Sequence, residues 1–237
     1  PAKGRDVTRH IGIVGVSPEG ASLFLRQLSR VASEVLEPHL HPRLTLHNEP
    51  LAFYIDAVRQ GDWHEVGRLL ARSAEKVAEA GASFCVTPDH AIHQAVHLAE
   101  SQSPIPWLVM TECVAEHLRD KGVKKVGIVG TKLVTSGSAY QSHLGLKGVQ
   151  VLAPSPEDAD RMDRIIFGEL IYGRVAPEAI SDVRRIVEGF RSLGCEGVIL
   201  ASSEAPLVIS GESWPLPLYD ASEILAQAAI RQAMTGA

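Results

Sequence analysis

Residues 11–17 read Ile-Gly-Ile-Val-Gly-Val-Ser, and residues 126–132 repeat this pattern as Val-Gly-Ile-Val-Gly-Thr-Lys. Each stretch is a short apolar run that is rich in β-branched residues, and a hydroxyl residue, Ser17 or Thr131, stands at or next to its end. Such a run predicts a buried strand followed by a turn. Its recurrence later in the chain predicts two halves built on one plan.

A second repeat places two polar residues at equivalent positions. Residues 81–89 read Gly-Ala-Ser-Phe-Cys-Val-Thr-Pro-Asp, and residues 194–202 read Gly-Cys-Glu-Gly-Val-Ile-Leu-Ala-Ser, so aligning the glycines pairs Asp89 with Ser202. We expect these two side chains on opposite sides of one cleft, as acid/base groups for a reacting carbon. A third repeat keeps the same order along the chain: residues 105–108 and 216–219.

Composition sets the class of protein. The chain has 237 residues, 45% of them apolar, which is typical of an ordinary globular protein. The net charge is -5 and the basic residues are scattered, so nucleic-acid binding is not expected. No apolar stretch is long enough to span a membrane, and residues 1–6 lack the apolar core of a secretion signal. Three unclustered cysteines fit a reducing compartment, and we expect a cytoplasmic protein.

Apolar runs alternate with segments of helical periodicity along the whole chain. This alternation predicts an α/β protein with two pseudo-symmetric, Rossmann-like domains, parallel sheets and an active site in the interdomain cleft. We expect an N-terminal lobe of residues 1–104 plus 216–237 and a C-terminal lobe of residues 105–215. The expected strands are 11–16, 44–46, 84–87, 107–110, 125–129, 151–152, 198–201 and 216–219. The expected helices are 21–36, 63–80, 91–101, 111–121, 136–144, 157–172, 177–193 and 222–234.

Two hydroxyl residues follow the repeated strands. Ser17 and Thr131 are good helix caps, and their hydroxyls with the following amides could equally hold a small carboxylate. Both interpretations use the same unsatisfied helix amides. The loop after the first strand lacks the glycine spacing of a nucleotide-binding loop, so we expect no nucleotide cofactor.

Polar, titratable residues follow the strand at 84–87. Asp89 and His90 are candidate functional groups, and His93 could share a helical face with His90. Two histidines without a third ligand at suitable spacing do not make a metal site, and we expect none. His93 is expected to be structural.

At these residues the sequence resembles the aspartate/glutamate racemase superfamily, whose members are cofactor-independent amino-acid racemases with two pseudo-symmetric α/β domains. The likeness runs through nearly the whole chain. It implies no cofactor, a homodimer, and a small carboxylate-bearing substrate. The residues in family-like positions for substrate binding are Ser17, Thr131, Lys132, Ser203 and Glu204. Further candidates for substrate binding are Asn48, His90 and Arg164. Arg164 could grip a carboxylate in a bidentate way or simply lie on a solvated helix face.

The sequence departs from the family at both catalytic positions. Family members usually carry one cysteine in a Cys-Asn-Thr-x-His type motif and another in Gly-Cys-Thr-Glu. Asp89 and Ser202 stand in those places, whereas His93 and Glu204 are kept. A thiol has a reference pKa of about 8.5, but that of an aspartate is about 3.9, so Asp89 needs a raised pKa to be an effective base. A serine is a poor acid and base unless a neighbour relays the proton.

We therefore expect an isomerase or racemase-like enzyme that transfers a proton at the carbon next to a carboxylate of a small acidic amino acid or a related acid. Asp89 and Ser202 would be its catalytic residues. The same scaffold could also serve a lyase, a decarboxylase, or a hydrolase in which His90 activates Ser202. A third alternative is a non-catalytic protein that binds a small acid.

Overall fold

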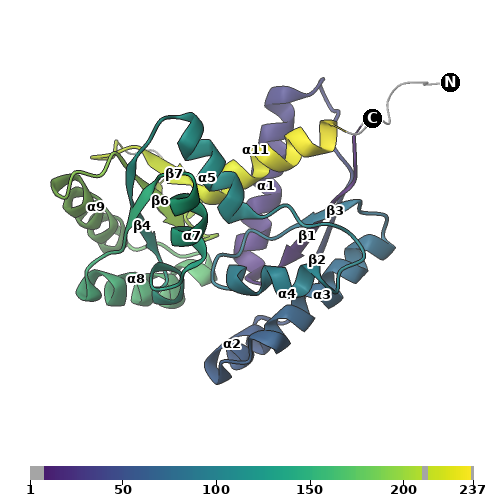
Figure 1. Cartoon of the computed structure of the whole chain (residues 1–237), viewed down its shortest axis with the longest axis horizontal. Coiled ribbons are helices and arrows are strands. Elements are labelled where there is room, and N and C mark those ends of the chain that lie inside the picture. The colour runs from purple at the N-terminus through teal and green to yellow at the C-terminus, as the bar shows by residue number, and fades with distance from the viewer. Residues whose placement is uncertain (1–7, 210–212, 236–237) are drawn as a thin grey trace. The chain divides into compact units, whose positions relative to one another are not determined.

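The computed structural model describes residues 8–209 and 213–235, and the chain divides into two compact units. Unit 1 comprises residues 1–110 and 225–237, and unit 2 comprises residues 111–224. Each unit has a parallel sheet with helices between successive strands, which confirms the predicted α/β class (Figure 1). Within the described ranges, no helix combines the length and the apolar character needed to cross a bilayer.

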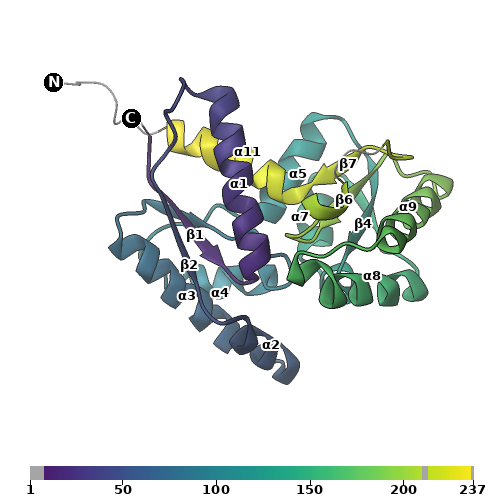
Figure 2. The ribbon, with the colours of Figure 1, turned by 180° about the vertical axis from the view of Figure 1, so that it is seen from behind.

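The sheet of unit 1 has the strand order β2-β1-β3. Figure 2 shows α1 beside β1, and one core cluster joins side chains of the strands to α3. The strands are β1 (Ile11–Gly15), β2 (Leu44–Asn48) and β3 (Phe84–Val86). The helices are α1 (Pro18–Val35), α2 (Leu51–Gln60), α3 (Trp63–Glu79), the 3-10 turn η1 (His93–Ala95) and α4 (Val96–Glu100).

The sheet of unit 2 has the order β5-β4-β6-β7. Its strands are β4 (Lys125–Gly130), β5 (Gln150–Leu152), β6 (Gly197–Ala201) and β7 (Leu218–Asp220). Helices α5 (Met110–Asp120) and α11 (Ala221–Met234) carry the chain from one unit to the other and back. The remaining helices are α6 (Lys132–Thr135), α7 (Ala139–Leu146), α8 (Pro156–Gly168), η2 (Leu170–Tyr172), α9 (Pro177–Ser192) and α10 (Pro206–Ile209).

The sequence repeat is a structural repeat at the level of strand register. Gly12 of β1 lies opposite Cys85 of β3, and Gly127 of β4 lies opposite Val198 of β6. The alignment that pairs Gly81 with Gly194 also pairs Cys85 with Val198. The strands that precede Asp89 and Ser202, β3 and β6, therefore pair with β1 and β4 in the same register.

The third repeat also has the same partner in both units. The amide of Cys85 donates to the carbonyl of Pro106 at 2.9 Å, and the amide of Val198 donates to the carbonyl of Pro217 at 3.0 Å. In unit 1 this contact amounts to a single parallel bridge from Cys85 to Trp107, where the sequence predicted a strand over 107–110. In unit 2 it extends into the full strand β7.

These pairings correct the predicted lobe boundaries, which were 1–104 plus 216–237 and 105–215. The boundaries assigned residues 105–108 to the second lobe and residues 216–219 to the first. Hydrogen bonding instead joins each segment to the sheet that precedes it in the chain. The chain changes units later, between Met110 and Thr111 and between Ile224 and Leu225.

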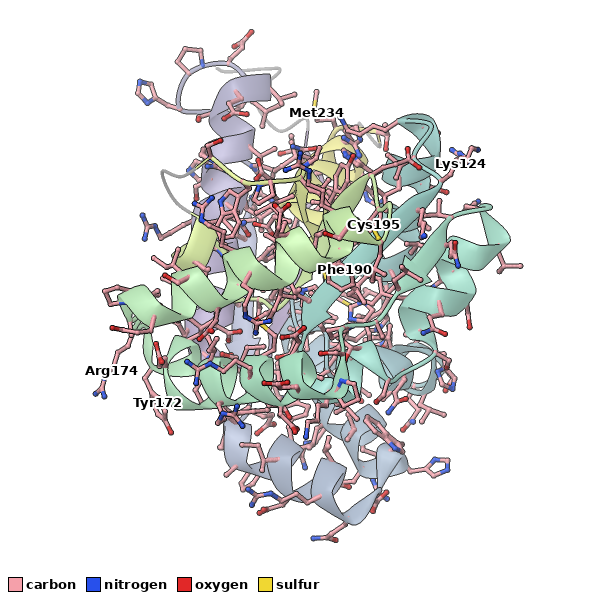
Figure 3. All side chains as sticks on the ribbon, turned by 90° about the vertical axis from the view of Figure 1, so that its left-hand side faces the viewer. Lys124, Tyr172, Arg174, Phe190, Cys195 and Met234 are labelled. Atoms are coloured by element: carbon pink, nitrogen blue, oxygen red, sulfur yellow. The ribbon has the colours of Figure 1, made fainter. Side chains whose placement is uncertain are left out.

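Strand glycines let helices pack closely against both sheets. A Cβ atom on Gly12 would lie 2.5 Å from the Val77 side chain of α3, and one on Gly127 would lie 2.3 Å from the Phe190 ring of α9. Figure 3 labels Phe190 on α9, followed by Cys195 beyond the helix end. Each glycine thus provides the space in which one helix contacts its sheet.

The sequence missed α2 and overestimated one helix. Pro50 precedes α2 without a side-chain cap, and the helix ends at Gly61 with a φ of 69°. A helix this short, without a side-chain cap, is not stable by itself, and α2 is held by its packing against α3. The helix predicted over 91–101 is instead the turn η1 followed by the five-residue α4.

Candidate active site

Asp89 lies in the loop that follows β3, and its side chain is only 9% exposed. Its Oδ1 accepts a hydrogen bond from the amide of Ala91 at 3.1 Å, which forms a tight side-chain turn. The Asp89 amide donates to Oγ1 of Thr87 at 3.3 Å. These contacts hold the carboxyl group at the tip of the strand, where the sequence predicted it.

His93 holds the same loop from the other side. Its Nδ1 lies 2.7 Å from the carbonyl oxygen of Asp89, and its Nε2 accepts from the amide of Met110 at 3.2 Å. Because the amide is a donor, Nε2 must be the bare nitrogen and Nδ1 must carry the proton. Both ring nitrogens are thus engaged by the backbone, which gives His93 the structural role expected of it.

His90 is buried beside this loop, with 5% of its surface exposed. Burial lowers its pKa well below the usual value, and the neighbouring His93 lowers the pKa further. His90 is therefore a neutral imidazole at physiological pH. In this state it can exchange hydrogen bonds with a ligand without adding positive charge.

Tyr54 is a residue near Asp89 that the sequence did not single out. It lies on α2 and is 1% exposed, and burial raises its pKa far above the usual value. The negative charges of Asp89 and Glu49 raise the pKa further. A neutral phenol is thus held in the electrostatic range of the candidate acid/base group. Only the position of α2, which the sequence did not predict, could have identified it.

Ser202 occupies the equivalent position after β6. Its Oγ donates to Oε2 of Glu204 at 2.8 Å and accepts from the Glu204 amide at 3.4 Å. The side-chain oxygen accepts from the amide two residues later, as in the turn formed by Asp89 and Ala91. Ser202, Ser203 and Glu204 are all buried. The two predicted catalytic residues therefore adopt the same local turn in the two units.

A small hollow, partly open to solvent, lies at the end of β6 in unit 2, and Ser202 is among its lining residues. Every other lining residue is apolar, and examples are Val129, Met162 and Leu200. The surface of this hollow is apolar, so the hydroxyl of Ser202 does not face it and is directed to the carboxylate of Glu204 instead.

Ser17 and Thr131 cap helices, as one of their two interpretations predicts. Oγ of Ser17 accepts from the Gly20 amide at 3.2 Å, and Oγ1 of Thr131 accepts from the Val134 amide at 3.4 Å. Both side chains are buried. Capping uses one helix amide in each case, and the carboxylate-binding interpretation stays a prediction.

Asn48 joins the tips of two strands. Its Nδ2 donates to the carbonyl of Val16 at 3.1 Å and to the carbonyl of Glu49 at 2.8 Å. A Cβ atom on Gly15 would lie only 2.1 Å from Oδ1 of Asn48, so this oxygen occupies the space beside the glycine. The side-chain amide of Asn48 therefore donates both of its protons to backbone carbonyls. The predicted role of Asn48 in binding substrate stays a prediction.

Lys132 and Arg164 both lie near the surface of unit 2. Nζ of Lys132 forms an ion pair with Asp160, and its amide donates to Oδ1 of Asp163 at 2.8 Å. Arg164 is exposed on α8, which fits the alternative of a solvated helix face. The structure thus ties Lys132 to α8, and the predicted roles of both cations in substrate binding remain predictions.

None of the three cysteines occupies the position of Asp89 or Ser202, and all three are buried. Cys85 is fully inaccessible, and burial raises the pKa values of Cys85 and Cys195. A thiolate is the reactive form, so these two thiols should react with a disulfide reagent at least about 100-fold more slowly in the folded protein than in denaturant. Stopped-flow absorbance with 5,5′-dithiobis(2-nitrobenzoic acid) measures the rates. Fast labelling of Cys85 without unfolding would contradict this expectation.

Comparison with known proteins assigns the family. A sequence profile described as Asp/Glu/Hydantoin racemase matches residues 13–229. The chain therefore belongs to the Asp/Glu/hydantoin racemase family, as the sequence resemblance indicated. Membership supports a racemase-like function on small acids.

Solved structures share the fold over nearly the full length of the chain. A Yersinia pestis protein provisionally described as an Asp/Glu racemase is 23% identical, with a TM-score of 0.85, and 96% of this chain and 100% of that one are covered. An aspartate racemase homologue from Pyrococcus horikoshii OT3 is 27% identical, with a TM-score of 0.81 and coverage of 95% and 99%. Unliganded arylmalonate decarboxylase is 15% identical, with a TM-score of 0.55 and coverage of 97% and 94%. The fold thus occurs in proteins described by more than one reaction.

Proposed function

We propose that this protein is a cofactor-independent racemase-like enzyme that transfers a proton at the carbon next to a carboxylate. Its substrate is a small acidic amino acid or a closely related acid. Asp89 removes or returns the proton for one enantiomer, and Ser202 serves the other. Family membership supports the reaction class. By the sequence resemblance, the two residues stand where the family motifs carry cysteines.

The observation that carries this proposal is the shared geometry of Asp89 and Ser202. Each follows the equivalent parallel strand, each is buried, and each side-chain oxygen accepts from the amide two residues later. Residues that only terminate a strand do not need matching turns in two halves of different sequence. Buried, fixed oxygens at matched strand ends are suited to transfer protons to and from a bound carbon acid.

The surroundings of Ser202 do not favour the hydrolase alternative. That mechanism requires an imidazole to take the proton of the serine hydroxyl. The hydroxyl of Ser202 instead donates to the carboxylate of Glu204 at 2.8 Å. Proton transfer to a carbanion fits this arrangement without an imidazole.

Deuterium exchange tests the proposed function. In D2O, the wild-type protein is expected to place deuterium on the α-carbon of at least one of L-aspartate, D-aspartate, L-glutamate and D-glutamate, and to form its mirror image. Proton NMR follows the loss of the α-proton signal, and chiral chromatography follows inversion. Absence of exchange with all four acids at millimolar concentration would contradict the proposal. Exchange without inversion would favour a one-sided reaction such as decarboxylation with protonation.

A further inference from the structure

Each half of the chain has one carboxyl group just after the strand that precedes its candidate catalytic residue, β3 or β6. The two carboxyl groups belong to residues at different positions in the repeat. In the first half the carboxyl group belongs to Asp89 itself. In the second half the equivalent residue is Ser202, and the carboxyl group belongs to Glu204, 2.8 Å from the serine hydroxyl. The residue equivalent to Glu204 in the first half is Ala91, which has no titratable side chain.

We infer that Glu204 stores the proton for the second half of the reaction and that Ser202 relays it. This inference rests on the proposed function and assigns Glu204 a positioning role through Ser202 in place of the substrate-binding role predicted from the sequence. A hydroxyl alone is a weak acid and a weak base near neutral pH, and a neighbouring base or acid is the general means of activating it. The carboxylate of Glu204 is the neighbouring group that the hydroxyl of Ser202 contacts.

The relay balances in both directions. When a proton is removed, the Cα–H bond breaks, its proton joins Oγ of Ser202, and the hydroxyl proton moves to Oε2 of Glu204. The electron pair of the broken bond is delocalised into the substrate carboxylate as an enediolate. When a proton is returned, Glu204 gives its proton to Oγ while the hydroxyl proton forms the new Cα–H bond. Neither direction leaves a serine alkoxide.

Burial makes the relay the favoured route. Ser202 is 9% exposed and Glu204 is 3% exposed, so little water reaches the pair. A proton that reaches Oγ is therefore directed to the carboxylate, which the Glu204 amide helps to align by donating to the same hydroxyl oxygen at 3.4 Å.

The inference predicts an effect on one enantiomer only. Glu204→Gln should lower the rate of α-proton exchange for one enantiomer of aspartate or glutamate by about 100-fold or more, and leave exchange of the other enantiomer, which Asp89 serves, within about threefold of wild type. Ser202→Ala should affect the same enantiomer. Because the two groups act in series, the double variant should be no slower than the slower single variant. Glu204→Asp should recover part of the lost rate.

The controls separate a relay from a structural effect. Glu188→Gln removes a carboxylate whose side chain is 51% exposed on α9 and should leave both exchange rates unchanged. Thermal unfolding monitors the fold of every variant. An equal loss for both enantiomers, or no loss for either, in Glu204→Gln would overturn the inference while wild-type exchange upholds the proposed function. Absence of exchange in the wild type would overturn both.

Discussion

Asp89→Asn is expected to lower the interconversion of enantiomers by about 100- to 10,000-fold in both directions, the range for loss of a general acid/base. Asparagine keeps the size of the side chain and an oxygen that can accept from the Ala91 amide at the observed 3.1 Å. It cannot take up a proton from carbon. The local turn should therefore persist while the chemistry fails, and chiral chromatography of the reaction mixture measures the loss.

A matched control removes a carboxylate that has no part in the proposed chemistry. Asp56 is exposed on α2, so Asp56→Asn should leave the rate within about twofold of wild type. Asp89→Asn should also retain α-proton exchange for the enantiomer that Ser202 and Glu204 serve. Interconversion at the wild-type rate in Asp89→Asn would show that another group supplies the proton and would contradict the assignment of Asp89.

Gly127→Ala is expected to destabilise the protein by about 1–3 kcal/mol, the usual cost of overpacking a close-packed core. The added Cβ would lie 2.3 Å from the Phe190 ring, far inside contact distance. Phe190 is 2% exposed in the core between β4 and α9, so its ring cannot swing into solvent. Urea denaturation followed by circular dichroism gives the change in the free energy of unfolding.

Gly189→Ala makes the same chemical change in the same unit and should have the opposite effect. Gly189 lies within α9, and a Cβ there would meet no described atom within 4 Å. Alanine in a helix interior is favoured over glycine by about 0.5–1 kcal/mol, so this variant should be stabilised by about that amount. Equal destabilisation by both substitutions would mean that the contact with Phe190 is not the cause.

The repeated segments made the fold predictable from sequence. Buried strands need apolar, β-branched runs, and parallel strands need helical crossovers, so the alternation alone predicted an α/β protein. The repeat also predicted the equivalence of Asp89 and Ser202, because register in a buried parallel sheet follows the apolar pattern. The strand pairings bear this out down to single residues, with Gly12 opposite Cys85 and Gly127 opposite Val198.

The lobe boundaries and the short elements were harder to predict. Residues 105–108 and 216–219 have the same pattern whichever sheet they join, and only hydrogen bonds to Cys85 and Val198 decide the matter. Likewise, α2 has little helical signal of its own and packs on α3. Tyr54 could not be connected with Asp89 until that helix was in place.

The sequence by itself determined the family, the two repeated halves and the identity of the residues at the two strand tips, because these depend on local pattern and order along the chain. Tertiary structure alone decided which groups those residues contact. The hydroxyl of Ser202 meets the carboxylate of Glu204, and the charge of Asp89 reaches Tyr54. Such contacts depend on turn geometry, side-chain rotamers and the packing of distant helices, and no pattern along the chain encodes them separately.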